Sequence, residues 1–446
     1  MRTAALVLAL LAAAGRATAA DRPPPTYRVD WIVRVDADDP AHAHVGWRFA
    51  GIDEITRFRI VFRDARARDV RGTGTLAWDG PTLTWTPGGP YAHLDYVVAI
   101  DRHRPPGGSR YDSHAAADWI ATRALHLFPE INVVFRAGAE RARSEARLLF
   151  ELPDGWQSLA AGAPLAPHVF RVEEPGQRLD RPRGWFLLGR DLRVERRTLA
   201  GSDVTVALAP GSRLDVARLW RLWSRTAPLL VPLLGPPPER LLLVSAPDPM
   251  WRGGISGEDS FFINGRIPTR SGDETSTYLH ELVHVWQPFR PAPDARWFSE
   301  GLAEYASLRL QHRAGLLDDA RFAHGLQLLS DQGTWGQDLT RSRAPAVLDD
   351  SAPLVVAALD LEIQRATEGR HGLDDVVRGL AAEGGTLTTA RVLAAARRAA
   401  GHDLGPFFRR HVLRGEAPPV PLALAAGLPA PGAMRYTRPP GRAATH

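Results

Sequence analysis

The stretch Tyr278-Leu279-His280-Glu281-Leu282-Val283-His284-Val285-Trp286 contains the pattern H-E-x-x-H. No Gly or Pro interrupts the chain from Asp273 to Gln287, and Pro288 follows, so the spacing predicts a helix that ends there. Residues i and i+4 of a helix lie one above the other, so His280 and His284 point the same way. Two imidazoles on one face can bind one Zn²⁺, whereas Glu281 can reach a water at the metal rather than the metal itself.

A second helix is predicted after a turn-rich connection. Its sequence reads Arg296-Trp297-Phe298-Ser299-Glu300-Gly301-Leu302-Ala303-Glu304-Tyr305. A catalytic zinc takes three protein ligands and keeps one position open, so we expect Glu300 to be the third ligand of one zinc per chain. Glu304 lies one turn later on the same face. It is either a carboxylate that hydrogen-bonds the outer nitrogen of a ligand His or a solvated surface residue.

These two motifs resemble the gluzincin zinc metallopeptidases, and are most like the glycyl aminopeptidase-like family, whose members often carry a PDZ domain. The family pattern H-E-x-x-H-x-W with W-x-S-E-G-x-x-x-Y is matched by His280, Glu281, His284, Trp286, Trp297, Ser299, Glu300, Gly301 and Tyr305. The similarity extends from about residue 25 to about residue 428, with no evident PDZ domain. It implies a multidomain α+β chain, in which an N-terminal β-sandwich-like domain precedes a thermolysin-like zinc peptidase domain with a helical C-terminal part.

The first departure from the family pattern concerns a GG-x-E segment. In the family this segment is an edge strand that pairs with the substrate backbone, and its Glu binds the free amino group of the substrate. Here Gly253 and Gly254 match, but Ser256 stands at the place of the Glu. Glu258 can substitute if the strand bulges at Gly257. Otherwise amine recognition is lost and an endopeptidase or another specificity follows; a hairpin without any substrate role is also open.

The second departure concerns the Y-x-K-G segment of the family, whose Tyr hydroxyl stabilises the tetrahedral oxyanion. Asp349 occupies the place of that Tyr. Because a carboxylate repels an oxyanion, either another donor takes the role or catalysis is weak or absent. The candidate donors are His312, His324 and a Tyr from elsewhere in the chain.

The domain organisation follows from where short alternating runs give way to helical ones. Alternation such as that from Tyr27 to Val35 predicts a β domain over residues 21–208. Residues 209–350 form the predicted catalytic domain, which begins with a helix over 214–233. Residues 351–416 are predicted to be helical, and residues 417–446 form a tail rich in Pro, Ala and Gly.

The first 20 residues have the features of a secretory signal peptide, with a basic start, a short apolar core and a small-x-small site. We therefore expect export, into a bacterial periplasm, without a membrane span. The chain has no Cys. Its formal net charge is +5, but the Arg residues are dispersed among 50 acidic ones, which argues against nucleic-acid binding.

The predicted function is an exported zinc metallopeptidase, expected to be an aminopeptidase, that acts on peptides or proteins with Glu281 as general base. The alternative is a catalytically weak or silent zinc-bound protein that binds peptides or a cell-envelope partner. Glu281 favours the enzyme, because a structural zinc site does not need it and normally has four protein ligands. A non-peptide hydrolase on the same scaffold is a third reading. The sequence does not determine the oligomeric state.

Overall fold

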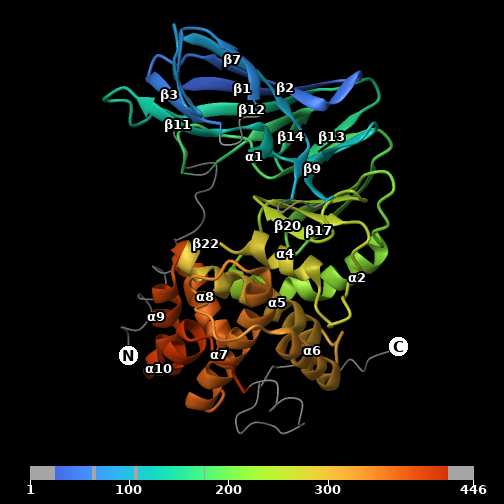
Figure 1. The fold of residues 1–446 in the computed structure, drawn as a ribbon, viewed down its shortest axis with the longest axis vertical. Coiled ribbons are helices and arrows are strands. Elements are labelled where there is room, and N and C mark those ends of the chain that lie inside the picture. Colours follow the sequence, from blue (N-terminus) through green and yellow to red (C-terminus); the bar gives the residue numbers. More distant parts are fainter. Residues whose placement is uncertain (1–25, 63–66, 105–108, 175, 420–446) are drawn as a thin grey trace, which may run out of the picture. The chain divides into compact units, whose positions relative to one another are not determined.

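The computed structural model describes residues 26–62, 67–104, 109–174 and 176–419. The chain divides into two compact units (Figure 1). The first contains the chain to Arg193 together with Ala207–Pro210 and Asp248–Trp251, and the second contains Val194–Val206, Gly211–Pro247 and the chain from Arg252. The predicted signal peptide and the tail from residue 420 lie outside the described residues.

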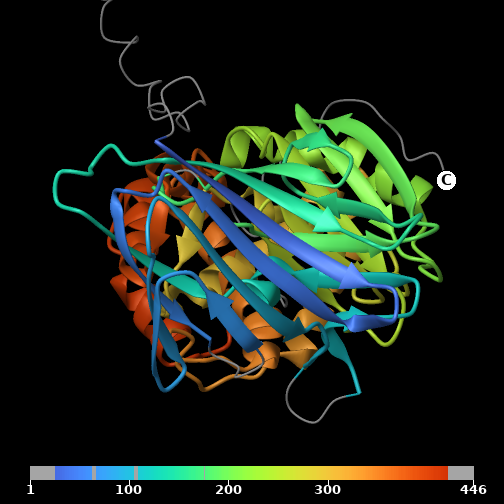
Figure 2. The ribbon, with the colours of Figure 1, turned by 90° about the horizontal axis from the view of Figure 1, so that it is seen from above.

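The first unit is built, in its described part, from three β-sheets whose strands run side by side as broad ribbons (Figure 2). The seven-stranded sheet has the order β14 (Pro164–Ala166), β15 (Val169–Val172), β12 (Ser144–Glu151), β1 (Tyr27–Asp36), β2 (Asp39–Ala50), β7 (Tyr91–Ala99) and β4 (Ala67–Gly72). The five-stranded sheet has the order β13 (Gln157–Ala160), β16 (Trp185–Gly189), β10 (Trp119–Arg123), β9 (Tyr111–Ala115) and β8 (Arg102–His103). The four-stranded sheet has the order β11 (Glu130–Phe135), β3 (Ile55–Val61), β6 (Thr82–Thr86) and β5 (Thr75–Asp79), and a short helix α1 (Ala124–Leu127) follows β10.

The core of this unit follows from the period-2 pattern of its strands. The alternation predicted from Tyr27 to Val35 is confirmed as β1, whose odd-numbered residues are buried while the residues between them keep contact with solvent. Trp31 on β1 and Trp47 on β2 are both fully buried and pack edge to face, with ring centroids 5.1 Å apart. The aromatic side chains of adjacent strands thus fill one shared core.

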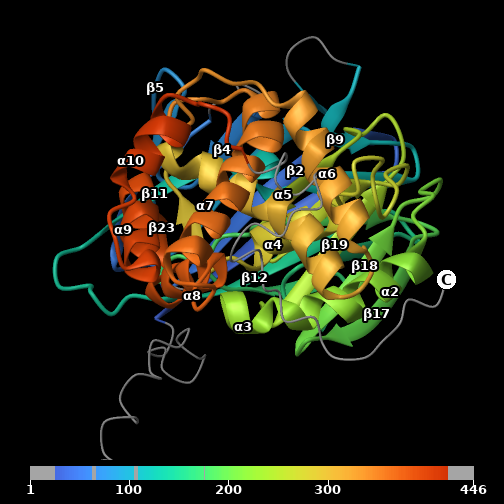
Figure 3. The same ribbon diagram turned by 90° about the horizontal axis from the view of Figure 1, so that it is seen from below.

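The second unit combines a sheet with a set of helices (Figure 3). The sheet has the order β17 (Arg193–Leu199), β18 (Ser202–Leu208), β19 (Arg240–Ala246), β21 (Ser260–Asn264) and β20 (Gly254–Gly257), so β20 lies at its edge. A further pair joins β22 (Phe289–Pro291) to β23 (Gly385–Leu387). The helices are α2 (Val216–Thr226), η2 (Ala227–Leu229), α3 (Val231–Leu234), α4 (Thr277–Trp286), η3 (Pro293–Ala295), α5 (Arg296–Arg313), α6 (Asp319–Gln332), η4 (Ala346–Ser351), α7 (Ala352–Ala366), α8 (Leu373–Glu383), α9 (Thr389–Ala400), α10 (Gly405–Phe407) and η5 (Phe408–Leu413).

The multidomain α+β class predicted from the sequence is confirmed by this architecture. Figure 3 shows α5 between α6 and α7, and the helices from residue 351 onward belong to the same compact unit as α4 and α5. Among the described residues, none of the helices combines the length and the apolar character needed to cross a membrane.

One predicted helix was wrong in its extent. The single helix expected over residues 214–233 is divided into α2, η2 and α3. Pro228 lies in the η2 turn and Pro232 in the first turn of α3. A proline has no backbone N–H and its ring clashes with the preceding helical turn, so each proline is compatible with a helix start but not with a continuous interior.

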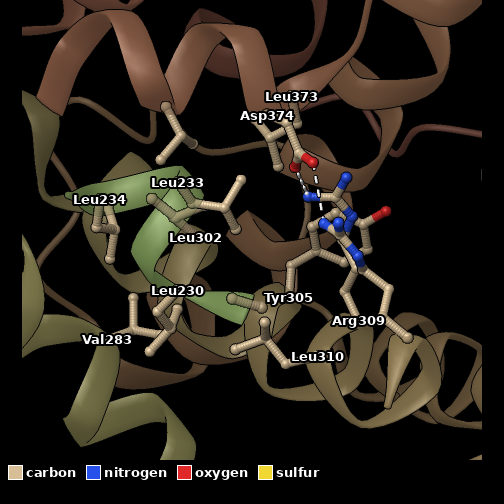
Figure 4. Close-up of a pocket in the computed structure, with 13 residues that line it drawn as sticks. Leu230, Leu233, Leu234, Val283, Leu302, Tyr305, Arg309, Leu310, Leu373 and Asp374 are labelled. Atoms are coloured by element: carbon tan, nitrogen blue, oxygen red, sulfur yellow. Dashed lines mark hydrogen bonds and ion pairs between the residues drawn. The ribbon is translucent and has the colours of Figure 1, made fainter. Parts of the chain in front are cut away.

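A buried ionic network holds α5 against α7 and α8. Asp360 on α7 has no exposed surface and accepts hydrogen bonds from the Tyr305 hydroxyl at 3.1 Å and from the backbone N–H of Leu373 at 2.8 Å. The Arg309 Nε lies 3.8 Å from the Asp360 carboxylate. Arg309 also donates to Asp374, at one end of an apolar cavity lined by α3, α4, α5 and α8 (Figure 4). The network therefore fixes α5 at the turn that follows Glu304.

Replacement of Asp360 by Ala should destabilise the second unit. The variant leaves Arg309 buried beside one acid fewer and the Tyr305 hydroxyl without its acceptor, and breaking a buried pair in this way costs about 3–5 kcal/mol. Urea unfolding monitored by circular dichroism measures the loss. Asp331→Ala, at an exposed carboxylate that accepts a hydrogen bond from Gln327, is the matched control and should stay within about 0.5 kcal/mol of wild type. An Asp360 variant as stable as this control would show that the buried network around Asp360 does not stabilise the second unit.

Candidate metal centre

Two helices of the second unit present the residues that the sequence singles out. The helix predicted around H-E-x-x-H is α4, and the downstream helix is α5. His280 and His284 lie one turn apart on α4, and Glu300 and Glu304 lie one turn apart on α5. Gly301 permits a close approach between α5 and the start of α7, because a Cβ at this position would lie 2.7 Å from the backbone of Ala352.

Three side-chain atoms converge where the two helices face each other. His280 Nε2 lies 3.0 Å from His284 Nε2, and Glu300 Oε2 lies 3.0 Å from His284 Nε2 and 3.4 Å from His280 Nε2. Ligand atoms held tetrahedrally at zinc distances of about 2.0–2.1 Å are roughly 3.3–3.4 Å apart, so the three atoms fit the ligand set of one zinc ion. Among the described residues, this is the one group of His, Cys, Asp and Glu side chains with such geometry.

Glu304 contacts the outer nitrogen of a candidate ligand. Its Oε2 lies 2.6 Å from His280 Nδ1, which leaves Nε2 of the same ring facing the converging group. A carboxylate in this position fixes the tautomer and the orientation of a metal-binding imidazole. Of the two roles left open by the sequence, the geometry supports the ligand-orienting one over a solvated surface residue.

The ionisation of the cluster reflects its burial and its crowding. Desolvation opposes the charged form of His280, but hydrogen bonds to Glu300 and Glu304 raise the pKa of this imidazole well above its ordinary value. Desolvation likewise opposes ionisation of Glu300, yet the neighbouring His284 and His280 hold the pKa of Glu300 well below its usual range. The site thus stabilises a carboxylate at the point where a cation would bind.

Glu281 is buried and lies against the edge strand rather than among the three converging atoms. A Cβ at Gly254 on β20 would lie 2.4 Å from Glu281 Oε1 and 2.8 Å from its Cδ. Only a glycine lets the strand approach the carboxylate this closely. Desolvation by burial raises the pKa of Glu281, followed by smaller effects of the surrounding charges. A carboxylate with a raised pKa is well suited to exchange protons near neutral pH.

The edge strand corrects one sequence-based expectation. β20 pairs with β21 from Gly254↔Ile263 to Gly257↔Ser260 without a register shift, so the bulge considered at Gly257 does not form. Glu258 instead lies in the two-residue turn after the strand, where Asp259 takes a positive φ of 49°. Side chains alternate along a strand, so Ser256 shares the face of Gly254 that is directed at Glu281. Gly253 immediately precedes β20, and the role of Glu258 in substrate binding stays a prediction.

Asp349 lies in η4, close to the converging group. Asp349 is exposed at the surface. Desolvation by the surrounding protein atoms raises the pKa of Asp349 to about 6. The nearby His280 opposes this shift, whereas Glu300 and Glu304 add to it. Its neighbour Asp350, which sequence reasoning missed, also has its pKa raised to about 6, by desolvation and then by Glu304. In the sequence, the adjacency of Asp349 and Asp350 was the signal that could have pointed to Asp350. Adjacent acids are common on solvated surfaces, however.

The other candidate oxyanion donors lie elsewhere or are engaged. His312 is 12 residues beyond Glu300 on the same helix, roughly 18 Å along its axis, and it contacts Asp319 at 2.6 Å. In the described part of the second unit, the Tyr278 and Tyr305 hydroxyls donate to Ile267 O at 3.0 Å and to Asp360 at 3.1 Å. Neither hydroxyl is left for an oxyanion. His324 is exposed on α6.

Replacement of Glu304 by Gln should weaken metal binding without abolishing it. The amide has no negative charge to hold the proton on His280 Nδ1, and loss of such an orienting partner typically reduces metal affinity about 10–100-fold. Competition for zinc against a chromophoric chelator measures the change. Glu362→Gln on α7 is the matched control and should keep the wild-type affinity. Equal affinities for both variants would show that the contact between Glu304 and His280 does not support the metal site.

The comparisons with known proteins rest on structure. No family model matches the chain, and no curated protein sequence matches it. Among solved structures, an aminopeptidase N family protein from Idiomarina loihiensis aligns with a TM-score of 0.68 at 15% identity, covering 88% of this chain and 77% of that one. The M1 zinc metallopeptidase from Deinococcus radiodurans aligns with a TM-score of 0.57 at 15% identity, covering 90% and 96%.

A third structure, Legionella pneumophila aminopeptidase A in complex with aspartic acid, aligns with a TM-score of 0.53 at 11% identity, covering 89% of this chain and 50% of that one. All three similarities extend over most of this chain, across both compact units. The gluzincin architecture expected from the two motifs is therefore confirmed as a fold: this chain has the fold of the M1 zinc metallopeptidases.

Proposed function

We propose that this protein is a zinc-dependent peptidase in which His280, His284 and Glu300 hold the metal and Glu281 is the general base. The observation that carries the proposal is the convergence of two Nε2 atoms and one carboxylate oxygen within 3.0–3.4 Å of one another. Glu304 supports His280 from outside this group, at 2.6 Å. The fold shared with the M1 zinc metallopeptidase from Deinococcus radiodurans adds support.

The chain's own residues supply the remaining parts of the mechanism. When bound, zinc supplies positive charge that polarises a carbonyl group and increases the acidity of water. Glu281 accepts a proton from the water that attacks the scissile carbonyl and transfers it to the leaving amine nitrogen. The open edge of β20 offers backbone groups that can pair with an extended peptide beside Glu281. Peptides and proteins are accordingly the proposed substrates, and removal of amino-terminal residues is the proposed mode.

Export is part of the proposal and rests on the sequence. Residues 1–20 carry the basic start, apolar core and small-x-small site of a signal peptide, and we place the mature protein in a periplasm on that ground. The absence of Cys is compatible with this compartment, because a chain of this size needs no disulfide bonds for its stability.

One experiment tests the function directly. The purified mature protein is analysed for metal content and incubated with a mixed peptide library, and the products are identified by mass spectrometry. We expect one zinc per chain and cleavage that stops when a chelator removes the metal. Successive single residues released from the amino end would establish an aminopeptidase, whereas internal cuts would establish an endopeptidase. Stoichiometric zinc without cleavage of any peptide would contradict the proposed activity.

Replacement of Glu281 by Gln should retain zinc and remove most activity. The amide cannot accept a proton, and general acid–base catalysis contributes about 10²–10⁴-fold to such rates. Both kcat for a cleaved peptide and zinc content should be measured, because only a fall in kcat at full zinc occupancy identifies the general base. A variant with wild-type kcat would exclude Glu281 from this role.

Gly254→Ala should also lower activity at full zinc occupancy, for a steric reason. The new Cβ would collide with the Glu281 carboxylate, and a displacement of about 1 Å in a catalytic group can cost about 100-fold in rate. Gly272→Ala is the matched control, since a Cβ at that position meets no atom within 4 Å. If both variants retained the wild-type kcat, the close contact between β20 and Glu281 would have no catalytic importance.

A further inference from the structure

Asp349 is a carboxylate beside the candidate metal centre that the proposed mechanism does not use. It is exposed on η4, and among the described residues it has no hydrogen bond or ion pair to another side chain. Its neighbour Ser351, by contrast, is fully buried and exchanges hydrogen bonds with the Thr334 backbone at 2.8 and 2.9 Å. The segment is thus anchored at Ser351 and leaves Asp349 accessible to solutes.

Packing places Asp349 near the metal ligands. Ala352, three residues after Asp349, contacts Gly301, and Gly301 directly follows the ligand Glu300. Residues three apart on a helix are about 5–6 Å apart, so Asp349 lies within one helical turn of this contact. Figure 3 and the helix contacts agree that α7, which continues η4, packs along α5.

The charges around Asp349 are mainly of its own sign. The largest charge effect on it comes from the imidazole of His280, which favours the carboxylate, followed by the opposing effects of the carboxylates of Glu300, Glu304 and Asp350; no guanidinium is among them. Burial together with these acids raises the pKa of Asp349 to about 6. A carboxylate in such surroundings gains more from an added cation than one that already has an Arg partner.

The edge strand offers no carboxylate that would compete for such a cation. On the face of β20 directed at Glu281, the positions are Gly254 and Ser256, and neither carries charge. Glu258 lies beyond the strand, in the turn that leads to β21. Asp349 is the exposed acid of the η4 segment that packs against α5, whereas its neighbour Asp350 is only partly exposed.

We infer that Asp349 determines substrate specificity, because its carboxylate binds a positively charged group of the peptide next to the scissile bond. The group is an ammonium or guanidinium, from the free amino terminus or from a Lys or Arg side chain. This inference rests on the proposed peptidase function and names the substrate class of the same site. It also gives a role to the acid that stands where a Tyr hydroxyl was expected.

The test compares three versions of one peptide that the library shows to be cleaved. The first is acetylated at its amino end and carries Gln beside the scissile bond, the second is acetylated and carries Arg there, and the third has a free amino end with Gln. The enzymes are the zinc-loaded wild type, Asp349→Asn and the control Asp331→Asn. The Asn side chain preserves the shape of Asp349 and removes only its charge.

For the wild type, we expect a higher kcat/KM for one or both charged peptides than for the neutral one. Asp349→Asn should lower the ratio of kcat/KM for the preferred charged peptide to kcat/KM for the neutral peptide about tenfold, chiefly through KM of the charged peptide. Preference for the second peptide identifies a side-chain cation, and preference for the third identifies the amino terminus. Asp331→Asn should behave as the wild type does.

The outcomes separate this inference from the function on which it rests. Cleavage of all three peptides with the same preference in wild type and Asp349→Asn overturns the inference and leaves the peptidase intact. Cleavage of no peptide in the library by the zinc-loaded wild type overturns both. If Asp349→Asn does not fold, the salt dependence of the wild type decides: the preference for the charged peptide should decrease as ionic strength rises, and a preference independent of salt overturns the inference.

Discussion

The contact between Glu304 and His280 is the interaction on which the candidate site depends, because it joins the two helices that carry the candidate ligands. With Glu304 on His280 Nδ1, the imidazole on α4 is held by a carboxylate from α5, and its Nε2 faces His284. The position of α5 must then be held within about 0.5 Å. Two features meet this requirement: Gly301 lets α7 approach α5 closely, and Asp360 binds the hydroxyl of Tyr305, the residue after Glu304.

A second constraint links Glu281, the proposed general base, to the edge strand β20. Because a Cβ at Gly254 would occupy the space of the Glu281 carboxylate, the positions of β20 and of the base are determined together. The open edge of β20 lies beside Glu281, so a peptide paired with this edge, as we propose, would bring its backbone to the Glu281 carboxylate. Burial raises the pKa of Glu281, which suits the proton transfer that we propose for it.

Much of this arrangement could be predicted from the sequence, where the signal was periodic or local. The i, i+4 spacing of His280 and His284 and the uninterrupted run around them predicted α4, and strict alternation predicted β1. The fold class came from the resemblance of the two motifs to the gluzincin metallopeptidases, together with the alternating runs that precede them. Pro228 and Pro232 carried the information that the helix over 214–233 is broken, but the apolar periodicity outweighed it.

What the sequence could not give depends on tertiary contacts. The choice between two roles for Glu304 required the distance to His280, and the course of β20 required the register of its pairing with β21. Asp350 could not be recognised from a periodic pattern. The charges that act on it belong to Glu304 on α5 and to Asp273 before α4, which are distant in the sequence. Such contacts join residues far apart in the chain, and neither local propensity nor spacing reports them.

The most direct test of the central claim is crystallographic. Diffraction data collected on either side of the zinc absorption edge, from crystals grown with zinc, show where the ion binds. The account predicts one anomalous peak about 2.0–2.2 Å from His280 Nε2, His284 Nε2 and a Glu300 carboxylate oxygen, with Glu304 still bonded to His280 Nδ1. A peak elsewhere, or His280 turned away from the ion, would contradict it.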